Sequence, residues 1–157
     1  MDRGGRGRHG ELPPRRVRLF LDTSVLLAAC ASERGASREI FRRHRAQGWR
    51  LISTPYAIEE VTRNLPKFPV AASAEWVRLR PHLRMRDNVL TLDRPVVFPA
   101  GKDRPILFGA LAWADVLLTL DRGDFASLLG TSFYSLLVLK PGVFLKRERA
   151  AGRLPAV

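Results

Sequence analysis

Short apolar runs alternate with helix-like segments along most of this 157-residue chain, and this alternation constrains the fold more than any other sequence feature. Runs of about five apolar or β-branched residues are too short for helices and predict buried strands. Pro or Thr at the start of the intervening segments and Gly at their ends predict helices. Strands that alternate with helices favour a mostly parallel sheet with helices on both faces. The predicted strands are 17–21, 49–53, a segment around 89–92, 116–120 and 135–139, and the predicted helices are 23–32, 36–47, 54–65, 70–80, 103–113, 124–130 and 141–150.

The length and the 46% of hydrophobic residues suit one α/β domain with a Rossmann-like parallel sheet of about five strands. We expect this domain over residues 17–150, after a flexible Arg- and Gly-rich arm (1–16) and before a short tail (151–157). No apolar run reaches the roughly 18 residues of a membrane span, so no membrane partner is expected. A single cysteine, Cys30, excludes an internal disulfide, and the start of the chain lacks an apolar signal segment, so we expect a cytoplasmic protein.

The chain is strongly basic, with 27 Lys and Arg residues against 15 Asp and Glu residues and a net charge of +12. Such a charge attracts polyanions without sequence preference, and nucleic acid is the most common polyanion. The composition therefore favours nucleic acid as a binding partner.

The acidic residues are few, and two of them follow apolar strands. Asp22 comes directly after the strand 17–21, and Asp121 comes directly after the strand 116–120. The carboxyl ends of parallel strands are where such sheets bind ligands, so we expect the two carboxylates to share a site. Asp103 opens a predicted helix, where a carboxylate is favoured by the helix dipole. We interpret Asp115, at the start of the same acidic segment as Asp121, as structural.

Clustered carboxylates repel one another and need cations or protons to neutralise them. Oxygen ligands alone select hard divalent cations such as Mg²⁺ or Mn²⁺. An acidic metal site in a basic protein is typical of a metal-dependent nuclease, in which basic side chains bind the phosphate backbone and metals activate water.

Four segments of the chain resemble the PIN domain ribonucleases, named for the PilT N-terminus, and particularly the toxins of toxin–antitoxin pairs. The resemblance covers about residues 17–146. It rests on VRLFLDTSVLL from residue 17, STPYAIEEV from residue 53, KDRPIL from residue 102, and ADVLLTLDRGDF from residue 114. No single segment is specific, but the ordered set is. The resemblance implies a PIN-like fold and metal-dependent endonucleolytic cleavage of RNA.

Carried over to this chain, the resemblance implies metal-binding and catalytic acids, second-shell hydroxyls that orient them, and basic residues that contact RNA. Helical spacing does not choose between Glu59 and Glu60, and we take Glu60 from its place before Val61. The family's toxin members also imply a cognate antitoxin protein, and a homodimer is an open expectation. The expected acids are Asp22, Glu60, Asp103 and Asp121, with Asp124 as a fifth candidate; the hydroxyls are Ser24 and Thr119; and the RNA contacts are Arg3, Arg6, Arg8, Lys102, Arg104 and Arg122.

Three alternatives stay open at this point. Haloacid-dehalogenase-like phosphatases also place an aspartate after a first buried strand, but they need a second aspartate two residues later, where this chain has Ser24. A receiver domain needs an acidic pair after its first strand, and Asp22 is followed by Thr23. The third alternative is a PIN-like module that binds RNA or a partner without cutting.

Overall fold

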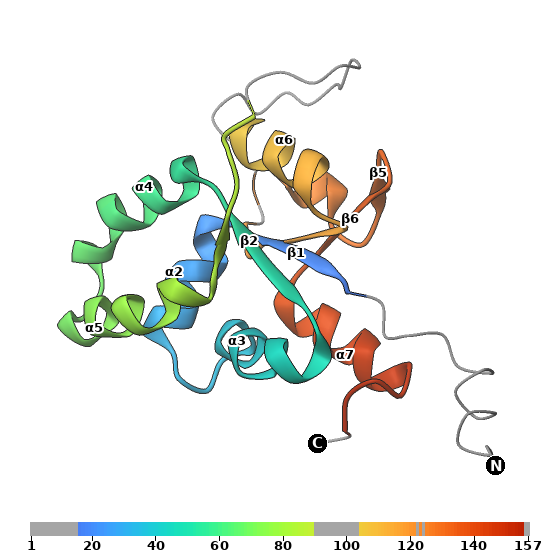
Figure 1. Cartoon of the computed structure of the whole chain (residues 1–157), viewed down its shortest axis with the longest axis horizontal. Helices are drawn as coiled ribbons and strands as arrows, with labels where there is room; N and C mark the ends of the chain where they lie inside the picture. The colour runs from blue at the N-terminus through green and yellow to red at the C-terminus, as the bar shows by residue number, and fades with distance from the viewer. Residues whose placement is uncertain (1–15, 90–103, 122, 124, 156–157) are drawn as a thin grey trace, which may run out of the picture.

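The computed structural model describes residues 16–89, 104–121, 123 and 125–155, which form a central sheet with helices packed on both faces (Figure 1). The strands are β1 (Arg18–Leu21), β2 (Arg50–Ser53), β3 (Arg84–Met85), β4 (Val116–Leu118), β5 (Ser132–Phe133) and β6 (Leu136–Leu139). The α-helices are α2 (Thr23–Ala31), α3 (Ala36–Gln47), α4 (Pro55–Asn64), α5 (Val70–Leu79), α6 (Arg104–Trp113) and α7 (Pro141–Ala150). Short 3₁₀ turns are η1 (Leu65–Lys67), η2 (Arg80–His82) and η4 (Ala126–Leu128).

The six strands form one sheet in the order β3-β2-β1-β4-β6-β5. Every neighbouring pair is parallel except β5 with β6. The predicted α/β class with a mostly parallel sheet is therefore confirmed, and β1 lies inside the sheet between β2 and β4. Leu19 pairs with Leu51 on one side and with Val116 on the other. Neighbouring parallel strands therefore finish together, at what we call the carboxyl end of the sheet, opposite its amino end.

Two details of the predicted elements are wrong, and a third is not tested. Most of the strand expected around 89–92 lies outside the described part of the chain, which leaves out residues 90–92; residue 89 is not in a strand, and the described strand β3 lies earlier. The helix expected over 124–130 is only the 3₁₀ turn η4. Strand β5 was not predicted: it forms a hairpin with β6 through Tyr134 (φ 50°) and Ser135 (φ 72°). Tight hairpins with two positive φ values normally carry Asn-Gly or a similar pair, and Tyr-Ser lacks that signal.

Successive residues of β1 face opposite helical layers, as the two-residue period of a strand requires. Leu19 and Leu21 belong to a core cluster with residues of α2, α3, α5 and α7, whereas Phe20 packs in a second cluster with residues of α6. Gly109 allows α6 to approach the sheet, because a Cβ atom at this position would lie 3.1 Å from the Phe20 ring. Both faces of β1 are thus buried, so a ligand can be contacted only by residues at its two ends.

Residues 1–15 of the predicted arm and 156–157 of the predicted tail lie outside the described part of the chain. Leu154, which belongs to the same predicted tail, is buried in the core. Among the described helices, none is both long enough and apolar enough to cross a bilayer.

Candidate active site at the carboxyl end of the sheet

Asp22 is the first residue beyond β1 and is almost fully buried, with 5% of its surface exposed. Its Oδ2 atom accepts two hydrogen bonds, from Ser24 Oγ at 2.9 Å and from Thr119 Oγ1 at 2.7 Å. Ser24 lies in the first turn of α2, and Thr119 follows β4. The carboxylate is therefore fixed between the strand that carries it and the next strand of the sheet.

The two hydroxyls that hold Asp22 are themselves oriented by backbone groups. Ser24 Oγ accepts the N–H of Leu120 at 3.1 Å, and Thr119 Oγ1 accepts the N–H of Asp121 at 3.0 Å. A backbone N–H can only donate, so each hydroxyl uses a lone pair there and directs its own hydrogen to Asp22. These contacts are the geometry that an orienting role for Ser24 and Thr119 requires.

Burial raises the pKa of Asp22 to about 6, and the charge of Asp121 adds to the rise. The hydrogen bonds from Thr119, Ser24 and the Thr23 backbone act in the opposite direction, because each of them stabilises the ionised carboxylate. Asp22 is thus a buried acid that loses its proton at a pH just below neutral. A cation beside it would complete this stabilisation.

Glu60 reaches the same region from α4. Its Oε1 atom accepts a hydrogen bond from Thr23 Oγ1 at 2.9 Å, so it lies against the first turn of α2, next to Asp22 in sequence. Glu59, by contrast, is exposed and pairs with Arg63 one helical turn away at 2.8 Å. The structure therefore brings Glu60, and not Glu59, to the carboxyl end of the sheet. Glu59 and Arg63 are four residues apart, a spacing that favours an ion pair on a helix surface. This spacing could have identified Glu59 as the surface residue and Glu60 as the site residue from the sequence.

Asp121 belongs to the turn after β4 and lies beside Asp22 through their shared partner Thr119. Its Oδ1 atom accepts the N–H of Gly123 at 2.7 Å, which is the local bond that Asp commonly makes in turns. Asp115 lies at the other end of β4: its carboxylate accepts bonds from the Arg18 backbone at 2.9 Å and from the Arg18 guanidinium at 3.0 Å. This pairing agrees with the structural interpretation of Asp115.

Several predicted site residues lie outside the described part of the chain, namely Asp103, Asp124, Lys102, Arg122, Arg3, Arg6 and Arg8. Arg104 is described and is the exposed first residue of α6. Within the described ranges, no group of three or more His, Cys, Asp or Glu side chains is close enough to hold a metal ion. The acidic residues described at this end, Asp22, Asp121 and Glu60, offer carboxylate oxygens, a donor type that suits a hard divalent cation.

Three hydroxyl residues near this end were not assigned a role from the sequence. Thr23 positions Glu60, and an ordinary Asp-Thr-Ser run gives no signal for that bond. Ser53 and Thr54, at the end of β2, are buried, and no partner for either hydroxyl exists among the described atoms. Buried hydroxyls are costly without hydrogen bonds, so these two residues are the least well satisfied polar groups described at the end of β2.

No protein-family model, curated protein or solved structure gives a significant match to this chain. What the protein does is therefore inferred from its own residues.

Proposed function

We propose that this protein is a metal-dependent endoribonuclease of the PIN-like type. One observation carries the proposal most strongly: the buried Asp22 carboxylate is held by Ser24 and Thr119 at the carboxyl end of β1, and the same Thr119 hydroxyl fixes the segment bearing Asp121. Parallel α/β sheets bind their ligands at this end. The net charge of +12 supports a polyanionic substrate.

The donor set supports Mg²⁺ or Mn²⁺ as the cofactor. Asp22, Asp121 and Asp103 would hold it, with Glu60 completing or orienting the set. Burial and the charge of Asp121 raise the pKa of Asp22, and a bound cation would offset both effects. When bound, the metal supplies an activated water and stabilises charge on the scissile phosphate.

The residues of the chain have separate roles in the proposed reaction. Ser24 and Thr119 keep Asp22 ionised and fixed in direction, and Thr23 holds Glu60 in place. Basic side chains bind the phosphate backbone. Water attacks phosphorus in line with the 3′-oxygen, which leaves and takes up a proton, so the products carry a 5′-phosphate and a 3′-hydroxyl.

The phosphatase alternative has less support. That mechanism needs an acid two residues after Asp22, and the residue there is Ser24, whose hydroxyl donates its hydrogen to Asp22. Release of inorganic phosphate from small phosphoesters with RNA left intact would nevertheless favour a phosphatase.

We also propose that the biological setting is a toxin–antitoxin pair, in which a small protein encoded by the adjacent gene binds and silences this one. Growth arrest on expression of the chain alone, relieved by co-expression of that neighbour, is the expected result. Arrest by an Asp22→Asn protein would contradict it.

The direct test of the activity is incubation of the purified protein with mixed-sequence RNA in Mg²⁺, Mn²⁺ or EDTA. We expect internal cuts in either metal, no cuts in EDTA, and fragments that a 5′-phosphate-dependent exonuclease degrades. Cleavage that persists in EDTA would contradict the proposal. Tight RNA binding without cleavage in any metal would favour the non-catalytic module.

A further inference from the structure

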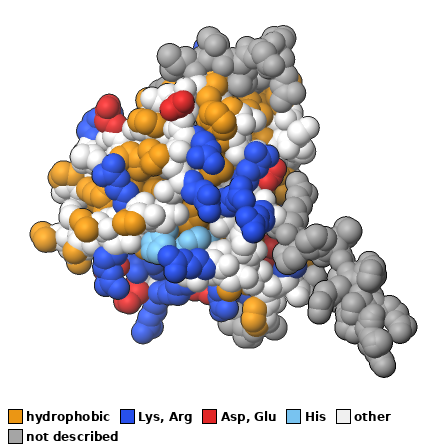
Figure 2. Space-filling model, viewed as in Figure 1, with side chains coloured by type: hydrophobic (Ala, Val, Ile, Leu, Met, Phe, Trp, Pro, Cys, Tyr) orange, Lys and Arg blue, Asp and Glu red, His pale blue; other side chains and the backbone are white. Residues whose placement is uncertain are grey.

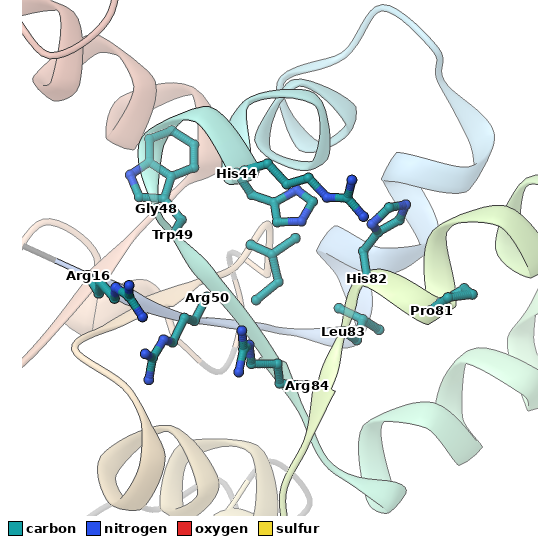
Figure 3. A pocket seen from close by; sticks show the side chains of 11 residues that line it. Arg16, His44, Gly48, Trp49, Arg50, Pro81, His82, Leu83 and Arg84 are labelled. Atoms are coloured by element: carbon teal, nitrogen blue, oxygen red, sulfur yellow. The ribbon is translucent and has the colours of Figure 1, made fainter. Parts of the chain in front are cut away.

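A second polar feature lies at the amino end of the sheet, away from Asp22. A cavity of about 480 Å³ opens where α3 turns into β2 and where η2 turns into β3. Figure 3 shows side chains from both sides of β2 lining it. We call it the arginine pocket, and its polar lining consists of Arg16, Arg45, Arg50, Arg84, His44 and His82.

The charge of the arginine pocket is of one sign. No Asp or Glu is among the described residues that line it. Within the described ranges, none of its four arginines forms a salt bridge. The neighbouring Arg18 differs, because Asp115 neutralises it. Figure 2 shows Lys and Arg side chains gathered beside the two described histidines on this face of the molecule.

The sheet itself places two of these arginines on one surface. Arg84 pairs with Ile52, which lies two residues after Arg50 on β2, so Arg50 and Arg84 project from the same face of adjacent strands. Like charges held together on a sheet repel each other unless an anion lies between them. Guanidinium groups cannot lose their charge, so these residues keep this repulsion at every physiological pH.

One histidine of the pocket is affected by the neighbouring positive charges as well as by burial. The pKa of His82 is lowered, mainly by burial and then by the charges of His44 and Arg45. The rings of His44 and His82 meet edge to face at 5.2 Å. Trp49 is buried and packs edge to face on Phe144 at 5.0 Å, so it cannot stack on a base.

We propose that the arginine pocket is a second RNA-binding site, which binds backbone phosphates of the strand at a distance from the cutting site. The choice of RNA rests on the proposed ribonuclease function. Arginine binds phosphate oxygens in pairs through its planar fork, and contacts to phosphate alone carry no sequence information. From Arg18 to Asp22 the strand rises roughly 13 Å, so the pocket holds a part of the RNA other than the scissile phosphate.

The test is equilibrium binding of a fluorescent single-stranded RNA in EDTA, with Asp22→Asn as the common background so that no strand is cut. Binding in this form does not depend on catalysis, so it stands even if the nuclease activity fails. The pocket variant carries Arg50→Ala and Arg84→Ala. The matched control carries Lys146→Ala and Arg147→Ala, which remove the same charge from exposed positions of α7 outside this pocket.

We expect the pocket variant to bind RNA roughly tenfold more weakly at physiological salt. A plot of the logarithm of its binding constant against the logarithm of the salt concentration should be less steep by about 1.4, because two phosphate contacts are lost. The control should lose no more than about threefold. Equal losses in the two variants would overturn the proposal. A variant with Arg50→Lys and Arg84→Lys keeps the charge without the planar fork. Its loss of RNA affinity should lie between those of the pocket variant and the control, which provides a test if the alanine variant does not fold.

A competitor separates RNA from a small phosphate compound. Inorganic tripolyphosphate and unlabelled RNA are each used to displace the labelled RNA. Counted per phosphate group, more tripolyphosphate than unlabelled RNA should be needed. If tripolyphosphate binds more tightly than RNA, and only that binding is lost in the pocket variant, the site belongs to a small polyphosphate and the RNA assignment is wrong.

Discussion

The two ends of the same sheet have opposite chemistry. At the carboxyl end, Asp22 is buried and bonded by two hydroxyls; Thr119 links it to the segment of Asp121, and its sequence neighbour Thr23 bonds to Glu60. At the amino end, Arg18 is tied to Asp115, and the arginine pocket lies beside it. The backbone pattern of β1 is the same at both ends, so the difference comes from which side chains follow and precede each strand. We propose a cation as the ligand of one end and phosphate groups as the ligand of the other.

The largest expected effect concerns the acid at the centre of the carboxyl end. Asp22→Asn removes the charge but keeps an oxygen for the Ser24 and Thr119 hydroxyls. RNA cleavage in Mn²⁺ should fall by more than the roughly 100-fold that loss of an orienting partner costs. Asp115→Asn is the matched control at the amino end and should keep the rate per folded molecule, although it lowers the melting temperature. Equal rates in the Asp22→Asn and wild-type proteins would contradict the assignment.

Without metal, the free energy of unfolding should depend on pH because of Asp22, and the arginines at the amino end should not produce this dependence. The pKa of Asp22 is about 6 in the folded protein against 3.8 ordinarily, so the folded state binds more protons between these values. Stability contributed by this group is present below about pH 4 and is lost as the pH rises to about 6. The loss is on the order of 3 kcal/mol, and it should vanish in Asp22→Asn. Denaturant unfolding in EDTA from pH 4 to 8 measures it; the same slope in both proteins would show that Asp22 is not the group.

The hydroxyl that links the two acids should have a smaller effect on activity. Thr119→Val removes a bond that lowers the pKa of Asp22, so that pKa should rise further and the acid limb of the pH–rate profile should move to higher pH. The rate at neutral pH should fall about 10- to 100-fold. Thr119→Ser keeps the hydroxyl and should restore both rate and profile. An unshifted profile in Thr119→Val would mean that the hydroxyl is only structural.

The smallest effect separates two neighbouring glutamates. Glu60→Gln should slow cleavage about tenfold, because Glu60 contacts the site through Thr23. Glu59→Gln, one residue away on the outer face of α4, should change the rate by less than about twofold. Initial rates at saturating RNA measure both. A larger loss in Glu59→Gln would reverse the choice between them.

Much of the fold was predictable because its signals are local. The helix over 36–47 ends at Gly48, which adopts a left-handed φ of 73°, and the strand 17–21 is a plain apolar run; both were predicted nearly to the residue. Strand β5 was not predictable, because its turn residues Tyr134 and Ser135 carry no hairpin signal. At the site, the placement of the acids at strand ends follows from topology. The Thr23–Glu60 bond does not, because it depends on how α4 packs beside α2.

The arginine pocket is a second feature that could not be predicted from the sequence. Arg16, Arg45, Arg50 and Arg84 are scattered over three elements and a preceding segment, and they come together only because β2 pairs with β1 on one side and with β3 on the other, where α3 leads into β2. From the sequence alone, these residues cannot be told from an ordinary basic surface. The RNA contacts that were predicted lie mostly outside the described residues.

The central claim, that the carboxyl end of the sheet holds a divalent cation, is tested most directly without any RNA. The melting temperature is measured as Mn²⁺ is added to the metal-free protein, in wild type, Asp22→Asn and Asp115→Asn. At about a hundred times the dissociation constant, the metal should add roughly 2.7 kcal/mol of stability. This corresponds to a rise of about 5 to 10 °C for a domain of this size. We predict this rise in wild type and in Asp115→Asn, and none in Asp22→Asn; a melting temperature unmoved by millimolar Mn²⁺ in wild type, or moved equally in Asp22→Asn, would contradict the account.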